Sequence, residues 1–198
     1  MGKAGGDEEM SHSQKFIFET AEIAVAIDWG LIEEMAGQLS KITGRIFFAG
    51  LGGSSANASH AVNDFRKLCH IEAYCISDNV AELTAIANDE GWSLIYANWL
   101  KNSNLTNHDA LFVLSVGGGS ENVSLPLIEA IKYAKYKGAR IFGIVGRDGG
   151  YTKRKGDCVI VIPVVNPERI TPHTEVFQSV ILHCLVSHPK LQKGKTKW

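Results

Sequence analysis

The sequence predicts a single α/β domain, in which a doubly wound, five-stranded parallel sheet is sandwiched between helices and further helices precede it. The first observation behind this prediction is an alternation along the chain. Short, continuously apolar segments alternate with longer segments of helical periodicity, which is typical of a parallel sheet covered on both faces. The second is size, because 198 residues with a hydrophobic share of 45% are enough for one sizeable core.

The part of the chain before the sheet is expected to be helical. Between about residues 15 and 42, apolar side chains recur at helical spacing with an interruption at 28–30, which one or two amphipathic helices would explain. Residues 1–13 are small, acidic and aperiodic and are interpreted as a disordered tail. The folded domain is expected over 14–189, followed by a solvated C-terminal tail over 190–198.

The alternation itself places the remaining elements in order. Apolar runs rich in β-branched and aromatic residues predict five strands, at 45–50, 71–76, 110–116, 140–146 and 158–164. Helical spacing predicts four further helices, at 56–67, near 92–101, at 121–137 and from about 173 to 187. The stretch 88–92 reads as a helix cap with acidic residues in the first turn.

Composition limits the classes of partner. A formal net charge of -1 provides no broad attraction for nucleic acid or an anionic membrane. No apolar run approaches the roughly 18 residues of a membrane span. The four cysteines lack CxxC spacing and follow no secretory leader pattern. We therefore expect a cytoplasmic protein in which they serve as packing residues.

Two loops rich in glycine and serine follow predicted strands. The first is GLGGSS (50–55) and the second is SVGGGSEN (115–122). Glycine lets the backbone approach an anion closely, serine hydroxyls donate hydrogen bonds, and helix N-termini favour negative charge. Together the loops predict a site for a phosphate monoester. Its candidate residues are Gly53, Ser54, Ser55, Ser115, Gly117, Gly118, Gly119 and Ser120.

Other interpretations of these loops fit less well or stay open. A dinucleotide fingerprint would need a third glycine where Ser55 stands and an acidic residue about 20 positions later, whereas Glu72 lies inside a predicted strand. A P-loop would need a GK[ST] ending, which neither loop has. Each loop taken alone could also be a plain turn between a strand and a helix.

Four ionisable residues form a second candidate site. His60 and Asp64 are spaced i, i+4 on the helix that leaves the first loop. Glu175 and His183 lie eight residues apart on the last helix, which keeps them on a broadly common face. Two imidazoles and two carboxylates could bind zinc or act as general acid and base. The alternative is that His60 belongs to a structural hydrogen-bond network and Glu175 is solvated.

Five segments, taken in order, resemble a known family. They are GLGGSSANASHAVNDF, LTAIANDEGW, LSVGGGSENV, GIVGRDGGY and TPHTEVFQSVILHCL. In this combination the chain resembles single-domain sugar isomerase (SIS) proteins of the phosphoheptose isomerase (GmhA-like) type, over roughly residues 15–189. The resemblance implies an intramolecular oxidoreductase that interconverts sedoheptulose 7-phosphate and D-glycero-D-manno-heptose 7-phosphate in heptose biosynthesis. It also implies a homotetramer with active sites between subunits.

The resemblance also implies roles for individual residues. Ser54, Ser115 and Ser120 would grip the sugar phosphate, and Asn88 and Asp89 join the substrate-binding set. His183 matches the family's catalytic acid. Asp64 stands where the family has a glutamate base, and Glu175 stands where a glutamine is usual. The positions that hold zinc in some members match His60, Asp64, Glu175 and His183.

The chain departs from the family pattern in ways that leave alternatives. The second loop usually resembles TSGNS, but residues 116–120 read VGGGS, so backbone N–H groups would carry more of the phosphate binding. The shorter carboxylate of Asp64 would draw the base back, leaving Glu175 as a substitute base. Rival functions are a binding-only SIS sensor or adaptor and an isomerase of a shorter phosphosugar.

Overall fold

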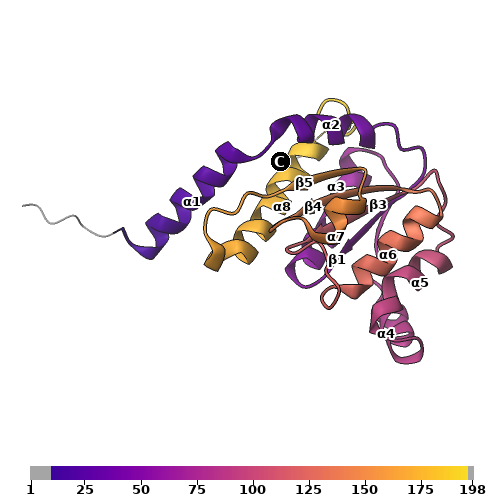
Figure 1. The fold of residues 1–198 in the computed structure, drawn as a ribbon. Coiled ribbons are helices and arrows are strands. Elements are labelled where there is room, and N and C mark those ends of the chain that lie inside the picture. Colours follow the sequence, from indigo (N-terminus) through magenta and orange to yellow (C-terminus); the bar gives the residue numbers. More distant parts are fainter. Residues whose placement is uncertain (1–9, 196–198) are drawn as a thin grey trace, which may run out of the picture.

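The computed structural model describes residues 10–195 and contains one five-stranded sheet in that range (Figure 1). The strands are β1 (Ile46–Gly50), β2 (Ala73–Cys75), β3 (Ala110–Ser115), β4 (Arg140–Val145) and β5 (Cys158–Val161). Their order in the sheet is β2-β1-β3-β4-β5, and every neighbouring pair is parallel. The predicted doubly wound parallel sheet is confirmed.

Eight α-helices surround the sheet within the described range. They are α1 (His12–Ala26), α2 (Trp29–Leu39), α3 (Gly53–Leu68), α4 (Val80–Asp89), α5 (Ile95–Asn102), α6 (Leu125–Tyr136), α7 (Gly150–Lys155) and α8 (Ile170–Val186). Short 3-10 turns, Trp92–Leu94 and Pro167–Arg169, precede α5 and α8. The interruption expected at 28–30 separates α1 from α2, because the Asp28 side chain caps α2 by accepting a hydrogen bond from the Leu31 N–H (3.1 Å).

Alternate residues of the strands build two hydrophobic cores on opposite faces of the sheet. Phe48, Phe112 and Phe142 pack against α1, α2, α3 and α8. Their neighbours in sequence, including Phe47 and Leu111, pack against α4, α5 and α6. This arrangement follows from the two-residue period of a strand, which sends successive side chains to opposite faces. A sheet buried on both faces explains the continuous apolar runs.

The structure corrects several predicted elements. Asn88 and Asp89 do not cap the helix predicted near 92–101: they end α4, which the sequence analysis did not anticipate, and the 3-10 turn that leads into α5 begins at Trp92 with no side-chain cap. The signal for α4 was Asn79, whose side chain caps it by accepting from the Glu82 N–H, a pattern of the capping-box kind. Helix α7 was also missed, because its six residues are too few to show a period. Helix α6 begins at Leu125 and not at residue 121, because Ser120 and Val123 pair across a tight loop.

Each predicted tail includes residues that the structure places in the folded domain. Helix α1 begins at His12, where Ser11 and Gln14 form a reciprocal capping box, while residues 1–9 lie outside the described range. At the other end, Leu191 is buried, and the N–H groups of Lys193 and Gly194 donate to the Leu68 carbonyl. These contacts tie the end of the described chain to α3. Between residues 10 and 195, no helix has the length and hydropathy that a bilayer crossing requires.

Candidate functional site

The carboxyl ends of β1 and β3 lie side by side where the winding of the sheet reverses. After β1 the chain crosses one face through α3, and after β3 it crosses the other face through α6. Ligands of open parallel sheets bind in the crevice at such a reversal. A cavity of about 470 Å³ lies here, and the loops that follow β1, β3 and β4 line it.

Of the eight predicted phosphate-binding residues, five line the cavity and three do not. Ser54, Ser115, Gly117, Gly119 and Ser120 line the cavity. Gly53, Ser55 and Gly118 are absent from its lining. The structure thus brings residues of both glycine–serine loops to one cavity.

The first loop leads directly into α3 with free N–H groups. Gly52 adopts a left-handed φ of 60°, and no side chain caps the helix, so the first N–H groups of α3 can bind an anion. The buried Tyr96 hydroxyl donates to the Gly50 carbonyl (2.5 Å) and holds the end of β1. Burial raises the pKa of Tyr96, so this phenol stays a neutral donor.

Hydrogen bonds with Ser115 and Thr152 hold the backbone of the second loop. The Ser115 hydroxyl accepts from the Gly118 N–H (3.0 Å), and the Gly118 carbonyl accepts from the Thr152 hydroxyl (2.8 Å). Gly118 has a φ of 66°, and a Cβ there would overlap the carbonyl of Gly149. Gly118 is therefore a packing position, while Gly117 and Gly119 present the loop to the cavity.

Helices α3 and α8 run parallel and side by side, which determines where their polar residues meet. In the first turn of α3, the Ser54 hydroxyl accepts from the amide of Gln178, which lies in the middle of α8 (3.0 Å). The Asn57 amide donates to the Glu175 carbonyl (2.8 Å). Farther along, Asp64 meets His183. Of these contacts, the one latest in α3 is thus also the latest in α8, and it lies farthest from the cavity.

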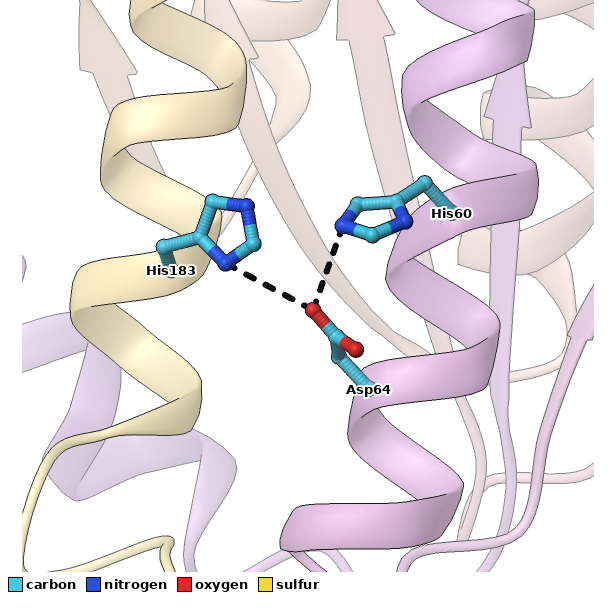
Figure 2. Close-up of side chains that lie close together, drawn as sticks. All are labelled: His60, Asp64 and His183. Atoms are coloured by element: carbon cyan, nitrogen blue, oxygen red, sulfur yellow. Dashed lines mark ion pairs between the residues drawn. The ribbon is translucent and has the colours of Figure 1, made fainter. Parts of the chain in front are cut away.

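His60, Asp64 and His183 form a compact cluster (Figure 2). The Asp64 Oδ2 lies 3.3 Å from the His60 Nε2 and 3.5 Å from the His183 Nδ1. The Asp64 side chain is 7% exposed, whereas the imidazoles are 51% and 52% exposed. The Asn63 amide donates to the Asp64 Oδ1 (2.9 Å). Asn63 thus holds one carboxylate oxygen of Asp64. The other oxygen faces the two imidazoles, which are themselves open to solvent.

The cluster fits a divalent metal of the catalytic kind. Its three ligand atoms all lie within 4.8 Å of one another. Two imidazoles and one carboxylate suit zinc, and catalytic zinc sites have three protein ligands and an open position. Glu175 is not part of this group, because eight residues of helix separate it from His183 by about 12 Å along the axis.

Glu175 instead lies at the start of α3. A Cβ on Gly53 would come within 2.5 to 2.6 Å of the Glu175 carboxylate, so the carboxylate packs directly on the Gly53 backbone. The predicted group of four therefore divides into a cluster of three and a carboxylate about two turns away. Asn88 and Asp89 are also not among the residues that line the cavity: both are exposed, and the Asn88 amide donates to Asp89 (2.8 Å).

Some residues of the site were not singled out by the sequence analysis. Arg147 and Arg154 line the cavity, and Asn57 and Gln178 connect α3 to α8. Arg147 carries a recognisable signal, since it follows β4 at the same edge of the sheet as the two loops. Asn57 and Gln178 carry none, because their roles depend on the register between two helices.

Comparisons with known proteins agree with this architecture. Residues 20–146 match the family model of the SIS domain. A relative from Nitratiruptor sp. named phosphoheptose isomerase is 34% identical over 148 residues, covering 72% of this chain and 74% of the relative. Another so named, from Helicobacter pylori, is 29% identical over 163 residues and 80% of each chain. The solved phosphoheptose isomerase GmhA from Neisseria gonorrhoeae has the same fold, with a TM-score of 0.73 at 23% identity over 89% of this chain and 96% of that one.

Proposed function

The chain belongs to the phosphoheptose isomerase family of SIS-domain enzymes, and on this premise we propose that it interconverts sedoheptulose 7-phosphate and D-glycero-D-manno-heptose 7-phosphate. The observation that carries the proposal is the pairing of two sites along α3. An uncapped helix start opens beside the glycine–serine cavity, and an acid–base cluster lies farther along the same helix.

The spacing of these sites suits a long sugar chain. Ten residues separate Ser54 from Asp64, a rise of about 15 Å along the helix. Side chains tilt toward the helix N-terminus, so the Asp64 carboxylate reaches back toward the cavity. A phosphate held at the start of α3 would direct an extended sugar along the helix toward Asp64 and His183. A shorter phosphosugar would span less of this distance.

The cluster supports proton transfer between adjacent carbons. Aldose–ketose isomerisation moves a proton between C1 and C2 and another between their oxygens, commonly through an enediol. We assign Asp64 Oδ2 as the base that removes the carbon-bound proton, because its partner oxygen is held by Asn63. His183 then serves the two oxygens, since its imidazole faces Asp64 and is open to solvent.

Zinc is the proposed alternative to His183 in stabilising the substrate oxygens. His60, Asp64 and His183 would hold it, and a bound divalent ion would then stabilise negative charge developing on a substrate oxygen in place of proton transfer by His183. Dialysis against a chelator should release one zinc per chain, measured by metal analysis, and lower turnover, with activity restored by added zinc. Unchanged activity after complete removal of metal would leave the three residues as acid and base alone.

The assembly proposed is a homotetramer in the cytoplasm, with sites at subunit interfaces. The exposed apolar residues of α1 and α8 support an assembly. The four cysteines, none paired in a disulfide, support a reducing compartment.

The direct test is incubation of the protein with sedoheptulose 7-phosphate while loss of ketose is followed. Conversion to a heptose 7-phosphate is expected. A hexulose phosphate and unphosphorylated sedoheptulose serve as comparison substrates. Preferential conversion of the hexulose phosphate would reassign the substrate. Binding of sugar phosphates without turnover would favour a sensor or adaptor.

A further inference from the structure

Two arginines line the cavity in addition to the glycine–serine loops. Arg147 follows β4, and Arg154 lies on α7, and both line the cavity together with Ser115 and Ser120. They come from elements that neither glycine–serine loop includes. The lining of the cavity therefore combines neutral hydroxyl and backbone donors with two guanidinium groups.

The backbone and neighbours of both arginines direct them to this place. Arg147 has a φ of 51°, in the left-handed region that non-glycine residues rarely adopt. Its Cδ lies 3.8 Å from the position of a Cβ on Gly117, so the side chain passes over the second loop. The Arg154 guanidinium lies 5.9 Å from the centre of the Tyr151 ring, and the backbone N–H of Tyr151 donates to the Gly119 carbonyl (2.9 Å).

The positive charge of these arginines exceeds the negative charge of the described cavity lining. Neither arginine forms an ion pair with a carboxylate of residues 10–195. One carboxylate, that of Asp148, also lines the cavity, and it accepts from the Gly150 N–H (3.1 Å). The lining therefore carries two positive charges against one negative charge, and its guanidinium groups keep their hydrogen-bond donors available.

We propose that Arg147 and Arg154 form a clamp for the phosphate dianion of the substrate, closing on it from β4 and α7 while the serine loops hold it from β1 and β3. This inference rests on the proposed function and adds the groups that select a phosphorylated sugar over its neutral counterpart. Guanidinium groups suit this role because they donate paired hydrogen bonds to phosphate oxygens and keep their charge at all physiological pH values.

The test compares Arg147→Gln, Arg154→Gln and the double variant with the wild-type protein. Calorimetry measures the affinity for sedoheptulose 7-phosphate, for sedoheptulose and for inorganic phosphate. Each single variant should bind the phosphorylated sugar about 10-fold or more weakly, the usual worth of a hydrogen bond to a charged group. Affinity for sedoheptulose should change little. Steady-state kinetics should show a raised KM with kcat largely kept, since the phosphate does not react.

Lys153→Gln is the matched control, because it removes one positive charge from α7 at an exposed residue outside the cavity lining. It should leave affinity for both sugars unchanged. Arg147→Lys and Arg154→Lys should recover part of the lost affinity. Equal losses in Lys153→Gln would reduce the effect to general charge and overturn the clamp.

Separate outcomes address the clamp and the reaction. If the wild-type protein isomerises the heptulose phosphate and the double variant binds it as tightly, the clamp is wrong and the function stands. If no turnover occurs but phosphate affinity falls in both arginine variants, the clamp stands and the reaction assignment fails. If the wild-type protein binds neither inorganic phosphate nor the phosphorylated sugar, the clamp is overturned.

Discussion

Asp64 is the one member of the three-residue cluster that is almost fully buried, and the two imidazoles shield it from solvent. Burial makes a carboxylate costly unless it is paired or hydrogen-bonded. Here Asn63 supplies the hydrogen bond at Oδ1, and His60 and His183 face Oδ2. A carboxylate held this way is restricted to one orientation, as a base in a stereospecific proton transfer requires.

The first prediction concerns this carboxylate and its partner. Asp64→Asn and His183→Ala should each lower turnover on sedoheptulose 7-phosphate by about 100-fold or more, the usual worth of a positioned proton-transfer group. Circular dichroism would verify that each variant folds. Ser187→Ala provides a control at the C-cap of the same helix, where the hydroxyl donates to the backbone carbonyls of His183 and Cys184.

Glu175→Gln separates the two candidate bases. Because Glu175 lies at Gly53 and outside the cluster, turnover should fall by less than about 10-fold, well short of the proton-transfer effect. Activity kept in Glu175→Gln and lost in Asp64→Asn would identify Asp64 as the base. The reverse pattern would transfer that role to Glu175. Full activity in all these variants would remove the cluster from the reaction.

The second prediction concerns Gly53. A methyl group there would strike the Glu175 carboxylate, so Gly53→Ala alone disturbs the contact between α3 and α8 as well as any approach to phosphate. We expect Gly53→Ala to destabilise the protein by about 1–3 kcal/mol, typical of overpacking, when measured by urea unfolding. In a Glu175→Ala background most of this loss should disappear, because the obstructing carboxylate is gone.

Phosphate affinity can also be measured for Gly53→Ala with and without Glu175→Ala. If Gly53→Ala still weakens phosphate binding when Glu175 is alanine, the glycine itself serves the anion. An unchanged affinity in that background would limit Gly53 to packing. Gly118→Ala cannot replace this test, because its methyl group would overlap the Gly149 carbonyl.

At the scale of elements, the sequence predicted which helix faces carry chemistry but not how the helices align. The spacing of His60 with Asp64 follows from α3 alone, and that of Glu175 with His183 from α8 alone. Joining the four requires the relative register of two helices, which depends on side-chain packing between them. The strands were predictable because they are apolar runs, of which β1 and β3 are buried on both faces, whereas α7 and the register of α8 depend on tertiary contacts.

Arg45 and Asp109 join the beginnings of β1 and β3, and the third prediction concerns their pair. The Asp109 carboxylate accepts from the backbone and side chain of Arg45 and from Thr106. Burial alone would raise the pKa of Asp109, but these hydrogen bonds outweigh it and hold the pKa below its ordinary value. The pair therefore stabilises the fold above the unfolded-state pKa, about 3.9, and the benefit is lost as pH falls through the lower folded-state value.

Asp109→Asn should accordingly lower the free energy of unfolding by about 2–3 kcal/mol at pH 7, since it leaves Arg45 without its charged partner. The difference from wild type should shrink as pH falls below about 4, as measured by urea titrations at pH 7, 5 and 3.5. Asp157→Asn is the matched control: Asp157 accepts from the Ile141 N–H and pairs with Arg140, but it is far more exposed. Its effect should stay near or below about 1 kcal/mol. A gap for Asp109→Asn that is constant with pH would contradict the assignment.

At the scale of the whole molecule, α1 is an element that the domain covers only in part. Figure 1 shows α1 reaching past the body of the domain. Ile23 is buried in the core, and Glu19 binds Arg169 (2.7 Å) and His173 (2.9 Å), which anchors the helix at its middle. The opposite side exposes large apolar side chains, with Val25 87% and Phe18 62% exposed. An anchored helix with an uncovered apolar side is what the proposed assembly would require.

The last prediction follows from this surface. Burying a side chain such as Phe18 or Val25 is worth about 1.5–3 kcal/mol, so several such residues repeated in each chain are enough to hold subunits together. Light scattering at micromolar concentration should give a mass near four times 21.6 kDa. Phe18→Glu combined with Val25→Glu should lower that mass while circular dichroism stays unchanged, because both side chains lie outside the core. Val80→Glu, an equally exposed apolar site on α4, should leave the assembly intact.

If active sites are shared between subunits, the dissociated variant should also lose turnover although its His60, Asp64 and His183 are untouched. A wild-type monomer would contradict both the tetramer and the shared site, whereas a dissociated variant with full activity would contradict only the sharing.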